Sequence, residues 1–104
     1  MKPAALKADE LAMLRRVFLR HPEITTVKLF GSRAKGTEVP GSDIDLALWG
    51  DVDGLGAEAI AAELDELPTP YKFDVKPFHL IKLRPLSEHI ERVGITVYPA
   101  ETTR

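Results

Sequence analysis

The sequence of 104 residues contains no cysteine, which excludes a disulfide framework and a metal site built from thiolates. No apolar run reaches the length of about 18 residues that a membrane-spanning helix requires. The first residues lack the apolar centre and cleavage site of a signal peptide. The net charge of −2 gives no general attraction to nucleic acid. We therefore expect a cytoplasmic protein whose partners include neither a membrane nor a nucleic acid.

The composition is that of a folded domain. Hydrophobic residues make up 44% of the chain and charged residues 29%, which is ordinary for a globular protein and argues against a disordered tail. A chain of this length is sufficient for one domain with one core and modest stability. We therefore expect residues 1–104 to form a single domain.

Hydrophobic periodicity predicts helices and strands that alternate along the chain. Apolar residues at helical spacing predict helices over 4–20, 57–67 and 86–93, and the polar, glycine-rich segment 50–56 is predicted to be a connection. Alternation and β-branched residues predict strands over 24–30, 43–49, 71–78 and 95–98. This order of elements is typical of a small α/β or α+β protein, in which helices pack on a sheet. The order of the strands stays open.

Two aspartates on an otherwise apolar strand are the first candidate functional residues. Side chains alternate along a strand, so Asp43 and Asp45 point to one face, about 6 to 7 Å apart at their α-carbons. Neighbouring carboxylates repel each other and are costly to desolvate. A magnesium ion, which is commonly held by one or two carboxylates together with substrate phosphates, removes this cost. The pair therefore indicates a divalent cation site, although Asp43 alone is also explained as a turn residue.

A glycine turn precedes the pair. Gly31 and Ser32 follow the strand 24–30, and backbone N–H groups in such a turn can bind an anion that a glycine allows to approach closely. Ser32 adds a hydroxyl, and Arg33 and Lys35 add positive charge. If the strands on either side of this turn are neighbours, the phosphate site and the cation site meet. A nucleoside triphosphate with bound magnesium needs both.

Asp74 is a candidate third carboxylate. In the strand 71–78, Lys72, Asp74 and Lys76 alternate with Tyr71, Phe73 and Val75, so the two sets face opposite sides. If this strand lies beside 43–49, Asp74 can share the metal or act as a general base toward an attacking hydroxyl. The alternative is a solvated strand face that Asp74 shares with the two lysines.

The segments GSRAKG and GSDIDLAL together resemble the signature of the nucleotidyltransferase superfamily that includes DNA polymerase beta. The family pattern is a Gly-Ser turn, an Asp-x-Asp on the next strand and a further Asp on a later strand. Gly31, Ser32, Asp43 and Asp45 match it directly, and Asp74 in YKFDVKPF matches by order and context. The resemblance extends over nearly the whole chain and is to the minimal nucleotidyltransferases of prokaryotes.

This resemblance implies a small mixed sheet flanked by helices and a magnesium-dependent transfer of AMP from ATP, or from another triphosphate, to a hydroxyl. It implies that Asp43, Asp45 and Asp74 are the catalytic and metal-binding residues. Gly31, Ser32 and Arg33 are then the nucleotide-binding residues. It also implies that the protein resembles antitoxins, whose usual partner is a HEPN-domain ribonuclease toxin that is modified on a tyrosine.

Two alternatives remain at this point. The chain can be a binding module that neutralises its partner by contact, or a nucleotidyltransferase that modifies a small hydroxylated molecule. A domain this small offers no evident second lobe that could bind an acceptor. We therefore expect the acceptor to be carried by another protein, or its site to be formed at a subunit interface. Either an oligomer or a hetero-complex is compatible with this expectation. We expect Trp49 and Phe78 in a core or interface, and helix residues such as Glu58 and Glu63 in solvent.

Overall fold

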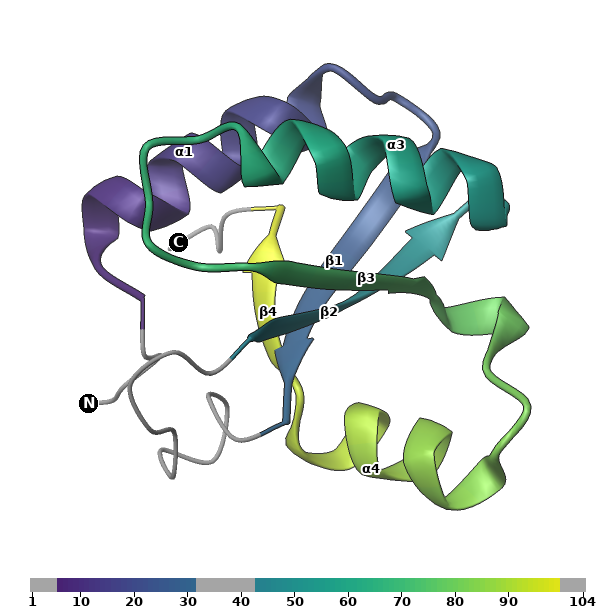
Figure 1. The fold of residues 1–104 in the computed structure, drawn as a ribbon. Helices are drawn as coiled ribbons and strands as arrows, with labels where there is room; N and C mark the ends of the chain where they lie inside the picture. The colour runs from purple at the N-terminus through teal and green to yellow at the C-terminus, as the bar shows by residue number, and fades with distance from the viewer. Residues whose placement is uncertain (1–5, 32–42, 100–104) are drawn as a thin grey trace, which may run out of the picture.

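The computed structural model describes residues 6–31 and 43–99, which form a mixed sheet with helices on both faces (Figure 1). The elements are, in chain order, α1 (Ala8–Leu19), β1 (Ile24–Phe30), β2 (Ile44–Gly50), α3 (Gly54–Asp65), β3 (Phe73–Pro77), the 3-10 helix η1 (Phe78–Leu80), α4 (Arg84–Val93) and β4 (Ile95–Tyr98). The sheet order is β3-β2-β1-β4, with β1 antiparallel to both of its neighbours and β2 parallel to β3. The predicted fold class, a small mixed sheet flanked by helices, is confirmed.

Most element boundaries differ from the predicted ones because hydrogen bonds at the ends of helices decide them. The helix predicted over 4–20 begins only at Ala8, because Lys7 is extended and its N–H donates to the Glu10 carboxylate at 2.9 Å. The helix predicted over 57–67 is shifted toward the N-terminus, because Asp53 caps it by accepting a hydrogen bond from the Gly56 N–H at 2.8 Å. The glycine-rich segment before residue 57 is therefore the first turn of α3.

The remaining differences are small. The last helix begins at Arg84 rather than 86, with a proline in its first turn. The strand predicted over 71–78 is limited to Phe73–Pro77, and the strand predicted over 43–49 is Ile44–Gly50. The strands at 24–30 and 95–98 are confirmed.

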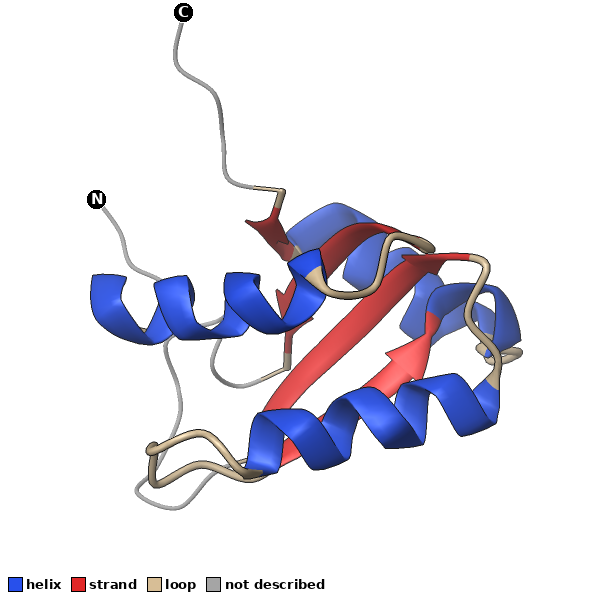
Figure 2. Cartoon of the chain, turned by 90° about the horizontal axis from the view of Figure 1, so that it is seen from above, coloured by secondary structure: helices blue, strands red, loops and turns tan. Residues whose placement is uncertain are grey.

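The larger hydrophobic core lies between the sheet and the pair α1 and α3, which cover the same face of the strands (Figures 1 and 2). Phe18 of α1, Ile60 of α3 and Leu46 of β2 are fully buried there. Ile44 and Leu48 are buried in the same core, as the alternation along β2 predicted.

A second, smaller cluster lies on the opposite face of the sheet, beneath α4. It consists of the buried Phe30, Ala47 and Ile90, with partly buried hydrophobic side chains packed around them. The expectation of one core was therefore incomplete, since the sheet is covered on both faces. Because Asp45 alternates with Ile44 and Leu46, its side chain lies on this α4 face.

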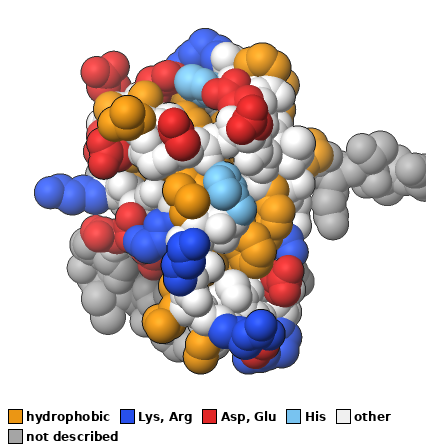
Figure 3. Space-filling view, turned by 90° about the vertical axis from the view of Figure 1, so that its right-hand side faces the viewer, with side chains coloured by type: hydrophobic (Ala, Val, Ile, Leu, Met, Phe, Trp, Pro, Cys, Tyr) orange, Lys and Arg blue, Asp and Glu red, His pale blue; other side chains and the backbone are white. Residues whose placement is uncertain are grey.

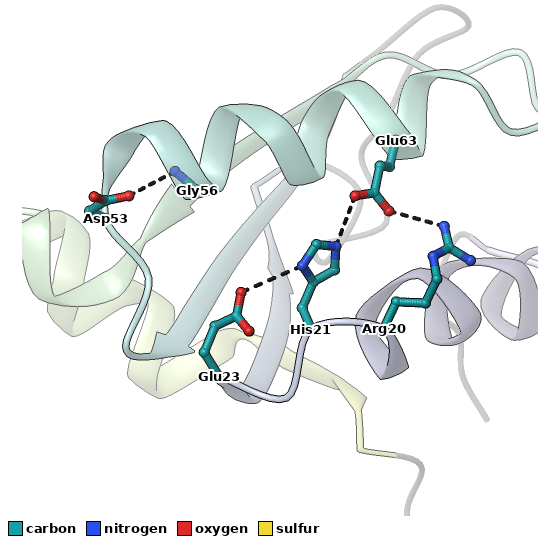
Figure 4. Close-up of polar contacts among 6 residues, drawn as sticks. All are labelled: Arg20, His21, Glu23, Asp53, Gly56 and Glu63. Carbon is teal, nitrogen blue, oxygen red and sulfur yellow. Dashed lines mark hydrogen bonds and ion pairs between the residues drawn. The ribbon is translucent and has the colours of Figure 1, made fainter.

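A group of charged side chains joins α1 to α3 (Figure 4). Glu63 of α3 accepts a hydrogen bond from Arg20 Nη2 at 3.0 Å and lies 2.9 Å from His21 Nε2. His21 Nδ1 is also 3.5 Å from a Glu23 carboxylate oxygen. The prediction that Glu63 is only solvated was wrong, because Arg20 and His21, in the turn after α1, both contact its carboxylate. None of the helices in the described ranges has the length and apolarity needed to cross a bilayer.

Candidate active site

Asp45 and Asp74 lie next to each other on the central and edge strands. The parallel pairing of β2 with β3 places Asp45 directly opposite Asp74 in register. Paired residues on adjacent strands are about 5 Å apart and their side chains share a face. Asp43 immediately precedes β2 and is exposed. The condition on which the role of Asp74 depended, that its strand is a neighbour of β2, is met.

Gly31, directly after β1, lies against the same carboxylate. Phe30 pairs with Asp45 across β1 and β2, and Gly31 follows with a φ of 82°. A Cβ atom at position 31 would overlap Asp45 Oδ2 and lie 3.3 Å from its Cγ. Position 31 therefore requires glycine both for its left-handed backbone and for the space that the carboxylate occupies. The predicted nucleotide-binding residues Ser32 and Arg33, and with them Lys35, lie outside the described residues.

The charges around Asp45 disfavour its ionised form. Partial burial raises the pKa of Asp45, and the negative charges of Asp74 and Asp43 raise it further, while Lys76 acts in the opposite direction. The Lys76 ammonium donates to Asp74 Oδ2 at 2.7 Å. Sequence reasoning considered Lys76 only as part of a solvated strand face. Its spacing of two residues from Asp74 on a strand was the signal that both share a face.

The donor chemistry of this face suits a hard divalent cation. The three aspartates offer only oxygen ligands, the kind that magnesium prefers. Burial and then repulsion from Asp74 and Asp43 raise the pKa of Asp45, and a bound cation would offset this repulsion. As the side chains stand within residues 6–31 and 43–99, no three His, Cys, Asp or Glu groups converge closely enough to hold a metal ion.

Aromatic and apolar side chains continue the α4 face beyond the carboxylates. Trp49 stacks on Phe78 with ring centroids 4.4 Å apart, and Lys28 lies 5.5 Å from the Trp49 ring. The expectation that Trp49 and Phe78 lie in a core or an interface is met by this contact and by their packing on the α4 cluster.

An open apolar groove begins at Lys76. It has a volume of about 350 Å³ and lies between the end of β3, η1 and α4; its lining residues are Lys76, Pro77, Leu80, Ile81, Lys82, Leu83 and Leu86. Figure 3 shows the side of the molecule on which η1 lies, where hydrophobic and basic side chains are interspersed. The groove leaves the Lys76 side chain 43% exposed beside the carboxylates.

A comparison with protein families gives a match to the model described as polymerase beta, nucleotidyltransferase, over residues 13–103. No curated protein matches the chain significantly. The segment that matches contains both carboxylate strands, Gly31 and the α4 face.

Several solved structures have a similar fold. A chain of a toxin-antitoxin crystal structure with AMP-PNP has a TM-score of 0.71 and 23% identity, over 89% of this chain and 73% of that chain. A chain of the toxin-antitoxin MntA-HepT has a TM-score of 0.68 and 17% identity, over 88% of this chain and 72% of that chain. A third similar chain comes from the complex of tri-AMPylated Shewanella oneidensis HEPN toxin with MNT antitoxin. It has a TM-score of 0.59 and 17% identity, over 85% of this chain and 71% of that chain. At these identities the likeness establishes the fold.

Proposed function

We propose that this chain, which belongs to the polymerase beta nucleotidyltransferase family, transfers AMP from ATP to a hydroxyl of a HEPN-type toxin. In this way it would act as an antitoxin. The observation that carries the proposal is the register of Asp45 with Asp74, beside the turn at Gly31. Two of the similar structures support the choice of nucleotide and acceptor, since one contains AMP-PNP and another contains a tri-AMPylated HEPN toxin.

The three aspartates would hold Mg²⁺, which supplies charge neutralisation for the triphosphate. Asp43 and Asp45 would bind it directly, and Asp74 would complete the site. In the transfer, the acceptor hydroxyl oxygen forms a bond to the α-phosphorus, and the bond from this phosphorus to the bridging oxygen of the β-phosphate breaks. Pyrophosphate leaves, and Asp74 accepts the hydroxyl proton as the base.

The turn after β1 would hold the triphosphate. Gly31 brings the backbone close to the Asp45 carboxylate, and Ser32 and Arg33 would follow it with a hydroxyl and a guanidinium. This arrangement would place the phosphates next to the metal-binding oxygens. We propose a tyrosine as the acceptor, and the cytoplasm, where ATP is available, as the site of the reaction.

The test uses ATP labelled at the α-phosphate, Mg²⁺ and the HEPN-domain protein encoded in the same genome. The wild-type chain should label that protein, and Asp45→Asn should reduce labelling by about 100-fold or more, because a carboxylate proposed to bind the metal is lost. The matched control is Asp51→Asn, at an exposed position just after β2. Full activity of Asp45→Asn, or equal losses in both variants, would refute the assignment.

A further inference from the structure

Lys76 is the cation nearest to the proposed metal site in the described part of the chain. Its Nζ lies 2.7 Å from Asp74 Oδ2, and both residues are on β3, two positions apart and on one face. In register, Lys76 lies opposite Ala47, so the neighbouring strand offers it no carboxylate at its own level. The ammonium therefore reaches back along β3 to one of the oxygens proposed to bind the cation.

A divalent cation and this ammonium compete for the same carboxylate. They carry charge of the same sign, and at a separation of about 5 Å their repulsion remains appreciable even in a largely solvated site. Lys76 already offsets part of the negative charge there, because its ammonium forms an ion pair with Asp74. A cation that binds without nucleotide must displace the ammonium and leave it without an anion.

The surroundings of Lys76 allow such a displacement. Its side chain is 43% exposed and that of Asp74 is 47% exposed, so neither is fixed by packing. Lys76 also lines the open groove of about 350 Å³ beside η1. A lysine carries its charge on a flexible four-carbon chain and can move from one anion to another within its reach.

We propose that Lys76 is a positioning residue that couples metal binding to nucleotide binding. It holds Asp74 in the metal-free chain, gives up this carboxylate to the divalent cation, and binds the negative charge of the incoming triphosphate. When the cation binds alone, the contact between the Lys76 ammonium and the Asp74 carboxylate is lost. When the cation binds together with a triphosphate, the triphosphate provides a new anion for the ammonium. Cation and nucleotide therefore increase each other's affinity by the same factor. This inference rests on the proposed function.

A purely structural salt bridge would behave differently. An ion pair this exposed contributes little to stability. Removing the ammonium would then remove its repulsion of the cation but leave the effect of nucleotide on the affinity for the cation unchanged. Binding measurements therefore separate the two roles, and they do not depend on catalysis.

The experiment measures Mn²⁺ binding by titration calorimetry or electron paramagnetic resonance, without nucleotide and with α,β-methylene ATP, which cannot release AMP. We expect Lys76→Met to bind Mn²⁺ alone about three- to tenfold more tightly than the wild type, since a repelling unit charge is gone. The factor by which nucleotide increases the affinity for Mn²⁺ should decrease to a similar extent. Lys76→Arg, which keeps the charge, should restore both toward wild type, and Lys72→Met, a nearby exposed lysine, should match wild type.

The outcomes distinguish the two proposals. A wild type that does not bind Mn²⁺ even with the nucleotide analogue overturns the proposed metal-dependent function, and the role of Lys76 with it. A wild type that binds Mn²⁺, together with a Lys76→Met variant in which the effect of nucleotide on Mn²⁺ affinity is unchanged, overturns the role of Lys76 alone, whatever the affinity for Mn²⁺ by itself. Equal changes in Lys76→Met and Lys72→Met also overturn it, because they would reflect net charge.

Discussion

At the scale of single residues, the charge on Asp45 lowers the stability of the fold. Burial and the nearby Asp74 raise its pKa above the ordinary value of 3.8, so the folded state binds its proton more tightly than the unfolded state does. Stability is therefore reduced at any pH above the folded pKa, and the penalty disappears as the pH falls toward 3.8. The site keeps a carboxylate that folding alone would not favour.

Asp45→Asn should therefore stabilise the protein while it abolishes transfer. Because Asp45 is only partly buried, solvent screening limits the gain to about 0.5 kcal/mol, which is a rise in Tm of about 2 to 4 °C at pH 7. Thermal melts followed by circular dichroism at pH 7 and at pH 4 measure it. The gain should shrink at the lower pH, and a variant that melts below wild type at pH 7 would contradict the prediction.

Gly31→Ala should displace the Asp45 carboxylate and destabilise the fold. A non-glycine residue at a φ of 82° costs about 1 to 2 kcal/mol in the free energy of unfolding. The new methyl group must also push the Asp45 carboxylate aside, so transfer should fall by roughly 100-fold. Urea denaturation and the labelling assay measure the two effects.

The matched control for Gly31→Ala is Gly54→Ala. A Cβ at position 54 meets nothing within 4 Å, and the residue begins α3, where alanine is a better helix former than glycine. This variant should keep wild-type activity and be equally stable or slightly more stable. A Gly31→Ala protein as active as Gly54→Ala would show that the close approach of the turn to Asp45 has no functional role.

At the scale of elements, Glu63→Gln should weaken the contact between α1 and α3. Burial acts to raise the pKa of Glu63, but hydrogen bonds from Arg20 and His21 outweigh it and lower that pKa below 4.5. The stabilisation is therefore complete above pH 4.5 and is lost as the pH falls through the folded pKa. Since the Glu63 side chain is about one-third exposed and its partner Arg20 is mostly exposed, we expect a loss of about 0.5 to 1 kcal/mol at neutral pH.

Urea denaturation at pH 7 and at pH 3.5 tests this expectation. The difference between wild type and Glu63→Gln should be present at pH 7 and small at pH 3.5. Glu58→Gln, at an exposed position of the same helix, should change stability at neither pH. If the two variants lose equal stability at pH 7, the loss comes from helix propensity or net charge and the Glu63 contacts contribute nothing.

The elements also show what periodicity can and cannot predict. Their buried faces follow from it, since Ile44 and Leu48 enter the core that the alternation of β2 indicated. Their ends do not, because capping groups decide them. The Asp53 cap turns a predicted glycine-rich connection into helix, and the Lys7–Glu10 contact delays the start of α1. The contacts of Glu63 with Arg20 and His21 join residues more than 40 positions apart, which no local pattern reports.

At the scale of the whole molecule, tertiary pairing determines which chemical groups meet. The motif and the alternation of side chains were enough to name Asp43, Asp45 and Asp74 as candidates. The sequence left strand order open, so the meeting of Asp45 with Asp74 became known only from the parallel pairing of β2 with β3. Lys76 lies on the same strand and face as Asp74, and the alternation predicted that shared face but not the ion pair between them; the roles of Ser32 and Arg33 stay predictions.

The proposed function predicts that the whole protein protects cells from a HEPN-type toxin through chemistry rather than through contact alone. Asp45→Asn replaces one oxygen of a half-buried side chain by an amide nitrogen and so nearly preserves the shape of the surface. Co-expressed with the HEPN-domain protein of the same genome, it should still co-purify with that protein yet fail to restore growth, while wild type and Asp51→Asn restore it. If Asp45→Asn protects as well as wild type does, neutralisation proceeds by contact, and the carboxylates on the α4 face serve some other reaction.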